Sequence, residues 1–227
     1  MTVTIYSNKL IIGTAQLQID DESMGCLSGQ FQPNDNYFNY IQHSVWEFWA
    51  TNKPDYKKWH SLRFNAQLGN GFFLFPTGGY TINDIEDLKD EPKRIDLAGI
   101  DLATLKLVDK TLLDPWCKIT IEQKNGLEDE LKKELSQEKN ILSKIFSPKR
   151  THILKDFEFS AVATYRPSDD VLFTINNPSN DNKFAVVHLT WKGEQEKFDN
   201  CPFTDLYKDF DDFTKRRMKP DNEDWDD

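Results

Sequence analysis

Residues 157–191 read FEFSAVATYRPSDDVLFTINNPSNDNKFAVVHLTW, and this stretch decides the fold of the chain. It holds three runs rich in Val, Ile, Phe and Thr, at 157–165, 171–175 and 184–191. A Pro-Ser-Asp turn separates the first two runs, and an Asn-rich segment separates the last two. Short apolar runs joined by such turns predict antiparallel strands, so the C-terminal part of the chain is expected to form a β-sheet.

The rest of the chain mixes further strands with a few helices. A hairpin is predicted at 2–19, and more strands are predicted at 61–68, 72–75, 95–107 and 118–122. Apolar side chains at helical spacing predict helices at 37–50, 127–146 and 204–218. A charged loop at 84–93 is expected to be exposed.

These patterns predict an α+β protein with mostly antiparallel β-sheet packed by about three helices. The β-rich regions form either two lobes or one extended sheet. The predicted organisation is a β-rich N-terminal lobe with one helix (1–122), a helical connector (123–150), a β-rich C-terminal lobe ending in a helix (151–219) and an acidic disordered tail (220–227).

Charge and composition restrict the classes of function. The 227 residues carry a formal net charge of -10, which disfavours nucleic acid and favours a basic protein partner. The alternative is that the charge only keeps the protein soluble. No apolar stretch approaches the roughly 20 residues needed to span a bilayer, the N-terminus does not resemble a signal peptide, and three scattered cysteines favour a reducing cytoplasm.

No catalytic or cofactor-binding motif is found. His188 and Thr190 form a single His-x-Thr pair, whereas phosphodiesterases that use this motif carry two, so packing on an ordinary strand is favoured over catalysis. Residues 25–29 hold Leu27 where a nucleophile elbow needs serine. The cysteines and histidines lack metal-ligand spacing, and the acids at 169–170 form either a turn or, with Asp181, a cation site. Neither a metal nor a cofactor is expected.

Two groups of residues are predicted to contact a protein partner, although each also has a purely structural interpretation. Aromatic residues around the first helix belong either to an interface or to the core. Acidic residues near the C-terminus form either a binding face for a basic protein or a solvated helix. The predicted contact residues are Trp46, Tyr56, Trp59, Asp205, Asp209, Asp211 and Asp212.

Two segments carry a resemblance to known proteins. The sequences DESMG and GQFQP lie within residues 21–33, and RPSDDVLF and AVVHLTWKG lie within residues 166–193. Together they resemble small bacterial proteins of unassigned activity, some of which are immunity proteins of polymorphic toxin systems. The resemblance implies an acidic α+β inhibitor without a catalytic residue of its own.

The expected function is therefore that of a cytoplasmic immunity protein or antitoxin-like inhibitor that occludes a basic toxin domain. Neither nucleic acid nor membrane is expected as a partner. One alternative is a non-catalytic accessory domain, with a homodimer as one possible form. The other alternative is an enzyme with a dispersed site around His188.

Overall fold

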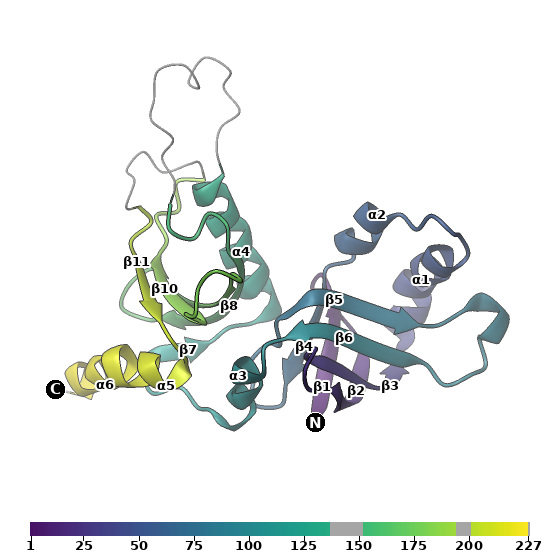
Figure 1. Cartoon of the computed structure of the whole chain (residues 1–227), viewed down its shortest axis with the longest axis horizontal. Helices are drawn as coiled ribbons and strands as arrows, with labels where there is room; N and C mark the ends of the chain where they lie inside the picture. The colour runs from purple at the N-terminus through teal and green to yellow at the C-terminus, as the bar shows by residue number, and fades with distance from the viewer. Residues whose placement is uncertain (137–151, 194–200, 227) are drawn as a thin grey trace, which may run out of the picture. The chain divides into compact units, whose positions relative to one another are not determined.

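The structure is a computed structural model, and it describes residues 1–136, 152–193 and 201–226. The chain divides into two compact units, an N-terminal unit (Met1–Lys110) and a C-terminal unit (Thr111–Asp227). The described residues form one antiparallel sheet in each unit, together with several helices (Figure 1). The predicted α+β class with antiparallel sheets is confirmed.

The N-terminal unit is built on a six-stranded sheet with the order β4-β1-β2-β3-β6-β5. Its strands are β1 (Thr2–Ser7), β2 (Leu10–Asp21), β3 (Cys26–Pro33), β4 (Phe64–Leu68), β5 (Pro76–Asn83) and β6 (Arg94–Ile100). Alternate residues of β1 are buried, at Val3, Ile5 and Ser7, because successive side chains of a strand point to opposite faces. The predicted N-terminal hairpin is confirmed by the pairing of β1 with β2.

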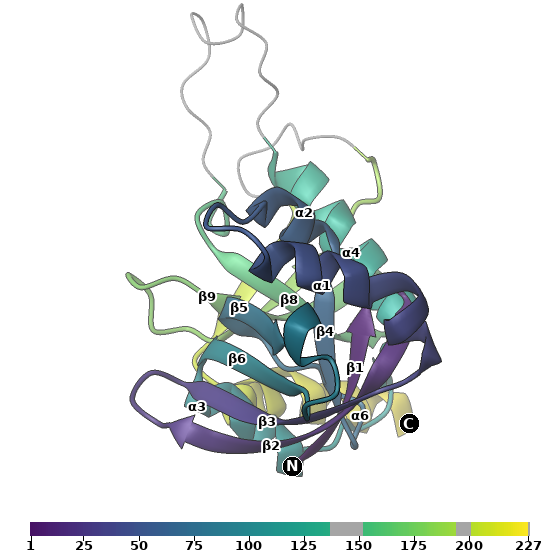
Figure 2. The same ribbon diagram turned by 90° about the vertical axis from the view of Figure 1, so that its right-hand side faces the viewer.

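Helices of the N-terminal unit lie beside strand β5 (Figure 2). The predicted helix at 37–50 is confirmed as η1 (Tyr37–Ile41) followed by α1 (Gln42–Trp49). A second short helix, α2 (Tyr56–Ser61), begins where the side chain of Asp55 accepts a hydrogen bond from the backbone of Lys58. The remaining short helices are η2 (Glu86–Leu88), α3 (Leu102–Leu105) and η3 (Lys106–Asp109).

The C-terminal unit has a five-stranded sheet with the order β11-β10-β9-β8-β7. Its strands are β7 (Trp116–Lys118), β8 (Glu158–Tyr165), β9 (Asp170–Asn176), β10 (Phe184–His188) and β11 (Thr204–Tyr207). Helix α4 (Ile121–Leu135) covers one face, and α5 (Phe210–Phe213), η5 (Thr214–Met218) and α6 (Lys219–Asp226) follow β11 on the other face (Figure 1). Because both faces are covered, residues 171–175 of β9 are buried without alternation.

The boundary between the units lies at Lys110–Thr111, whereas the sequence was divided at 122, 150 and 219. The segment predicted as a connector is not separate, because its helix starts at Ile121 and packs on the C-terminal sheet. Thr120 and Gln123 form a capping box there, so the helix starts six residues before the predicted start at 127, and Asn125-Gly126, a pair typical of turns, lies inside it. The later part of that prediction, 137–151, lies outside the described residues.

Two predictions near the C-terminus are wrong. The helix expected at 204–218 is preceded by strand β11, because Thr204–Tyr207 pairs with β10, and the helix begins only after Asp209. The tail expected to be disordered forms helix α6 as far as Asp226. Asp221 anchors that helix, since its carboxylate accepts hydrogen bonds from Arg217 one turn earlier and from the indole of Trp116.

Candidate functional site

Tryptophans of α1 and α2 attach these helices to the edge strand β5. The indole N–H of Trp49 donates to the carbonyl of Ile82 at 2.8 Å, and that of Trp59 donates to the carbonyl of Tyr80 at 3.1 Å. The two carbonyls are two residues apart on the strand, so they point to the same side. Trp59 is buried and Trp46 is half-buried, so the structure uses both residues to pack the unit.

Tyr56 is the exposed member of the predicted aromatic contact group. It is 60% exposed, and its ring packs edge-on against Phe48 with 5.6 Å between centroids. The ring centroid of Phe48 also lies 4.2 Å from that of Trp59, so α1 and α2 share one aromatic cluster. A cavity of about 320 Å³ lies beside this cluster, with Glu47 and Lys58 among its lining residues. Of the three predicted aromatic contact residues, Tyr56 presents the most surface to a partner.

A buried carboxylate organises the far end of β5. The side chain of Asp84 is fully buried and accepts hydrogen bonds from the hydroxyl of Tyr37 at 2.7 Å, from Gln42 at 3.0 Å and from the indole of Trp46 at 3.1 Å. The ammonium of Lys93, also buried, lies 3.5 Å from the carboxylate. Burial, together with the adjacent carboxylate, raises the pKa of Tyr37 far above its usual range. Asp84 and these four partners are called the Asp84 hub below. The hub connects η1, α1 and the end of β5 to the segment that leads into β6.

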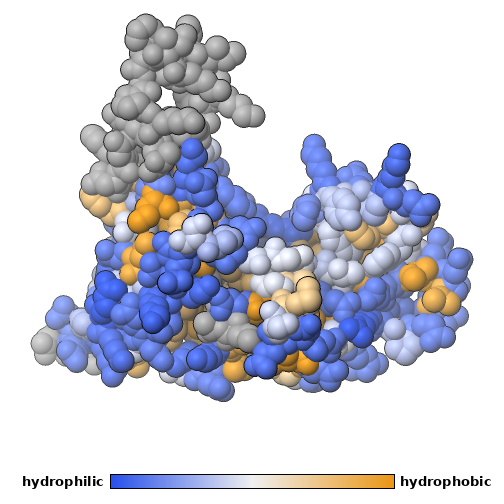
Figure 3. Space-filling model, viewed as in Figure 1, coloured by the Kyte–Doolittle hydropathy of each residue, from blue (hydrophilic) through white to orange (hydrophobic). Residues whose placement is uncertain are grey.

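Above this hub, the β5–β6 connection forms an exposed tip, defined here as residues 85–91. Lys93 stabilises the tip, because its ammonium also donates to the carbonyl of Lys89 at 2.8 Å. Ile85 and Leu88 are 43% and 54% exposed, and hydrophobic surface at this end of the hairpin lies among hydrophilic residues (Figure 3). The acidic residues of the tip are Glu86, Asp87, Asp90 and Glu91, all exposed.

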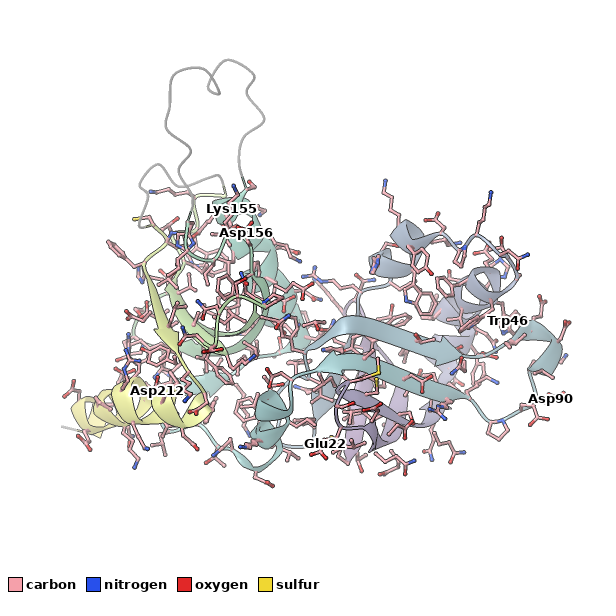
Figure 4. The ribbon with its side chains drawn as sticks, viewed as in Figure 1. Glu22, Trp46, Asp90, Lys155, Asp156 and Asp212 are labelled. Atoms are coloured by element: carbon pink, nitrogen blue, oxygen red, sulfur yellow. The ribbon has the colours of Figure 1, made fainter. Side chains whose placement is uncertain are left out.

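The sequence predicted a charged, exposed loop at 84–93, and the structure corrects this at both ends. Asp84 and Lys93 are buried in the hub, and only the residues between them form the exposed tip. Figure 4 shows Asp90 at the end of the hairpin and Trp46 near the base of the tip, on α1. No sequence pattern distinguished the two buried charges from the exposed ones.

The four predicted acidic contact residues near the C-terminus have different roles. Asp209 caps α5 by accepting a hydrogen bond from the backbone of Asp212, and Asp212 in turn pairs with Arg216 at 3.0 Å. Asp211 is exposed on α5, and Asp205 is exposed on β11. Two of the four carboxylates therefore stabilise the local fold, whereas the other two lie on the surface.

A row of side chains crosses one end of the C-terminal sheet. Trp116 pairs with Tyr165, His188 pairs with Asp170, and the backbone of His188 donates to the carbonyl of Phe203 at 2.9 Å. The two residues of the His-x-Thr pair do not lie on one strand, because β10 ends at His188. The side chain of Thr190 instead donates to Glu134 of α4 at 3.1 Å.

Arg217 of η5 connects this row to the helices. Its guanidinium donates to Asp170 at 2.8 Å and to Asp221 at 2.8 Å, and it lies 5.1 Å from the centroid of the Tyr165 ring. The other carboxylate oxygen of Asp170 lies 2.8 Å from Nδ1 of His188. Burial alone would raise the pKa of Asp170, but the hydrogen bonds from His188 and Arg217 hold it below its usual range. The result is an ordered chain from Asp221 through Arg217 and Asp170 to His188.

A pocket of about 460 Å³ opens beside His188. Its lining residues come from β9, β10, η5 and the start of β11, and they are Asp170, Val186, His188, Phe203, Thr204, Asp205 and Arg217. The volume is in the range of small-ligand sites. The sequence singled out His188 and Asp205 separately, but the pairing of β10 with β11, which brings them together, was not predicted.

The cation site that was the alternative to a turn for the acids at 169–170, together with Asp181, is not assembled in the described residues. Asp169 accepts a hydrogen bond from the indole of Trp191, and Asp170 is bonded to His188 and Arg217. Among the described residues, no group of three or more His, Cys, Asp or Glu side chains could hold a metal ion. In the same part of the chain, no helix is both long and apolar enough to cross a membrane.

The chain matches no protein-family model, and no curated protein or solved structure shows significant similarity to it. Function is therefore inferred from the tip of the N-terminal unit and from the pocket of the C-terminal unit.

Proposed function

We propose that this protein binds and inhibits a basic protein partner, as an immunity protein or antitoxin-like inhibitor does. The observation that carries the proposal is the tip at 85–91, which presents four acids together with the exposed side chains of Ile85 and Leu88 and is bonded to Lys93 at its base. Acidic side chains speed the encounter with a basic surface, and exposed apolar side chains supply area to bury once contact is made. The formal net charge of -10 means that the protein as a whole also attracts a basic partner.

The Asp84 hub adds preorganisation to this surface. A binding loop that is already ordered loses less conformational freedom when the complex forms. The ammonium of Lys93 donates a hydrogen bond to the carbonyl of Lys89 within the tip, and the same ammonium pairs with the carboxylate of Asp84. An exposed, acidic tip of this kind can enter a basic active-site cleft and occlude it. In this proposal the protein has no catalytic role or cofactor of its own.

The proposed compartment is the cytoplasm. The three cysteines Cys26, Cys117 and Cys201 are free thiols, which fits a reducing environment. Of the other predicted contact residues, Tyr56, Asp205 and Asp211 are exposed, while Trp46, Trp59, Asp209 and Asp212 support the fold.

The test uses the full chain and the product of a toxin gene next to its own. Binding is measured by surface plasmon resonance at two salt concentrations, and protection is measured by co-expression. In the tip variant, Glu86→Lys is combined with Asp87→Lys. The matched control combines Glu22→Lys with Asp35→Lys, which changes two other exposed acids of the same unit.

We expect the tip variant to bind at least about tenfold more weakly, with a slower association rate, while the control retains binding and protection. Absence of binding to the neighbouring product at micromolar concentration would contradict the inhibitor proposal. Equal losses in both variants would contradict the role of the tip.

A second candidate is an enzyme that uses His188, and one observation favours it. The bond from Nδ1 to Asp170 leaves Nε2 free to exchange a proton with a substrate in the pocket. If His188→Ala leaves every measured phenotype of the cell unchanged, this candidate is excluded.

A further inference from the structure

The pocket beside His188 has a defined set of hydrogen-bonding groups. Nδ1 of His188 lies 2.8 Å from the Asp170 carboxylate, which can only accept a hydrogen bond when ionised. Nδ1 is therefore the donor in this bond, and in the tautomer with a single ring proton Nε2 is an acceptor. Because the His188 side chain is 46% exposed, that acceptor is accessible from the pocket.

Asp205 supplies a second acceptor. It is exposed, lines the pocket, and its carboxylate forms no hydrogen bond or ion pair with other described residues. Val186 pairs with Asp205 and precedes His188 by two residues, so His188 and Asp205 are diagonal neighbours on one face. Diagonal neighbours lie roughly 7–8 Å apart at Cα, which leaves room for one donor group to reach both side chains.

Phe203 supplies an aromatic face. It is 61% exposed and lies directly across from His188, since the backbone of His188 donates to its carbonyl. An exposed ring beside a carboxylate is a favourable environment for an ammonium or guanidinium group.

The charges of the pocket favour a cation over an anion. Arg217 is the positively charged residue among the lining residues, and its charge is balanced by Asp170 and Asp221. The carboxylate of Asp205 has no such counter-charge among the described residues. An incoming phosphate or carboxylate would therefore meet uncompensated negative charge, whereas an incoming cation would compensate it.

From this geometry we infer that the pocket is a binding site for an alkylguanidinium or alkylammonium group, held between Asp205, Nε2 of His188 and the ring of Phe203. The group can belong to a free amine or guanidine, or to an arginine or lysine side chain of a peptide. This inference concerns the C-terminal unit and is independent of the tip proposed above.

The experiment follows the backbone amides of the ¹⁵N-labelled full chain during titration. The probes are butylguanidinium chloride, a blocked Gly-Arg-Gly peptide and inorganic phosphate, at constant ionic strength. The variant is Asp205→Asn. The matched control is Asp181→Asn, which changes an exposed aspartate in the turn before β10 that has no ion pair within the described chain.

We expect saturable shifts at Val186, His188 and Asp205 with both guanidinium probes, and affinity about tenfold weaker in Asp205→Asn but unchanged in Asp181→Asn. Tighter binding of the peptide identifies a basic side chain as the ligand, and tighter binding of butylguanidinium identifies a free small molecule. Either result supports the site. Absence of saturable shifts at millimolar probe, stronger shifts with phosphate, or equal losses in the two variants would overturn it.

Discussion

The ammonium of Lys93 lies 3.5 Å from the carboxylate of Asp84, and both side chains are buried beneath an exposed acidic tip. A buried ion pair of this kind contributes little net stability compared with apolar packing, but it is costly to break on one side only. Because the hydroxyl of Tyr37 and the indole of Trp46 also donate to Asp84, the pair fixes the geometry of the surrounding segments.

Replacement of Asp84 by alanine is therefore expected to destabilise the protein strongly. The change leaves the buried ammonium of Lys93 without its counter-charge, and the donors that reach Asp84 lose their carboxylate acceptor, which costs about 3–5 kcal/mol. Urea unfolding followed by tryptophan fluorescence measures the loss. In the control Asp87→Ala, which removes an exposed acid of the tip, the free energy of unfolding should change by less than about 0.5 kcal/mol.

Trp59 was predicted to contact a partner, but its main role is expected to be structural, through the hydrogen bond of its indole nitrogen. In Trp59→Phe the hydrogen bond from the indole to the carbonyl of Tyr80 is lost, and we expect a cost of about 1 kcal/mol in a thermal unfolding experiment. Tyr56→Phe changes an exposed aromatic residue of the same helix and should cost less than about 0.5 kcal/mol. If the two variants had equal stability, the indole bond would not be holding α2 to β5.

These contacts explain which parts of the structure the sequence could predict. The three strands between 157 and 191 and the helix at 37–50 were predicted because their periodicity and turn residues are local. The burial of Asp84 was not predicted, because its partners come from positions 37, 42, 46 and 93. A pattern of neighbouring residues cannot show that side chains so far apart in the sequence meet at one carboxylate.

The pocket illustrates the same limit. His188 and Asp205 were both identified as candidate residues, but for different reasons and in different roles. They share a pocket because Thr204–Tyr207 forms a strand against β10, where apolar side chains at helical spacing predict a helix. The helix begins only after Asp209, which caps it, because pairing with β10 holds the preceding residues in a strand.

Glu134 should make stability depend on pH in a direction opposite to most carboxylates. One oxygen accepts from the backbone of Thr190 and of Trp191, while the other is buried without a partner among the described residues. Burial raises the pKa of Glu134 in the folded state. Its favourable contribution is therefore present below the unfolded pKa and is lost as the pH rises through the folded pKa.

The variant Glu134→Gln removes this titration. The stability of the variant relative to the natural protein should increase as the pH rises from about 4 towards neutrality, since only the natural protein must ionise a buried acid. Urea unfolding across this range measures the difference. Glu122→Gln, an exposed position in the first turn of the same helix, serves as the control and should show no such trend.

Asp170 should produce the usual acid sensitivity. Its folded pKa is depressed by the hydrogen bonds from His188 and Arg217, which outweigh its burial. The stability that it contributes is therefore present above the unfolded pKa and is lost as the pH falls through the folded pKa. Asp170→Asn should be less stable than the natural protein at neutral pH, and the difference should shrink on acidification below about pH 4. A difference that stays constant with pH would show that the pairing is not ionic.

The capping box at Thr120 offers a test of where helix α4 starts. The hydroxyl of Thr120 accepts a hydrogen bond from the backbone of Gln123, whose side chain accepts one from the backbone of Thr120. Because this capping box starts the helix at Ile121, Thr120→Ala should cost about 1 kcal/mol, whereas Thr120→Ser should be nearly neutral. Had the helix begun at 127, as its apolar spacing suggested, neither substitution would alter the protection of amides 123–126 from hydrogen exchange. Faster exchange of these amides in Thr120→Ala alone would show that the first turn of α4 depends on this cap.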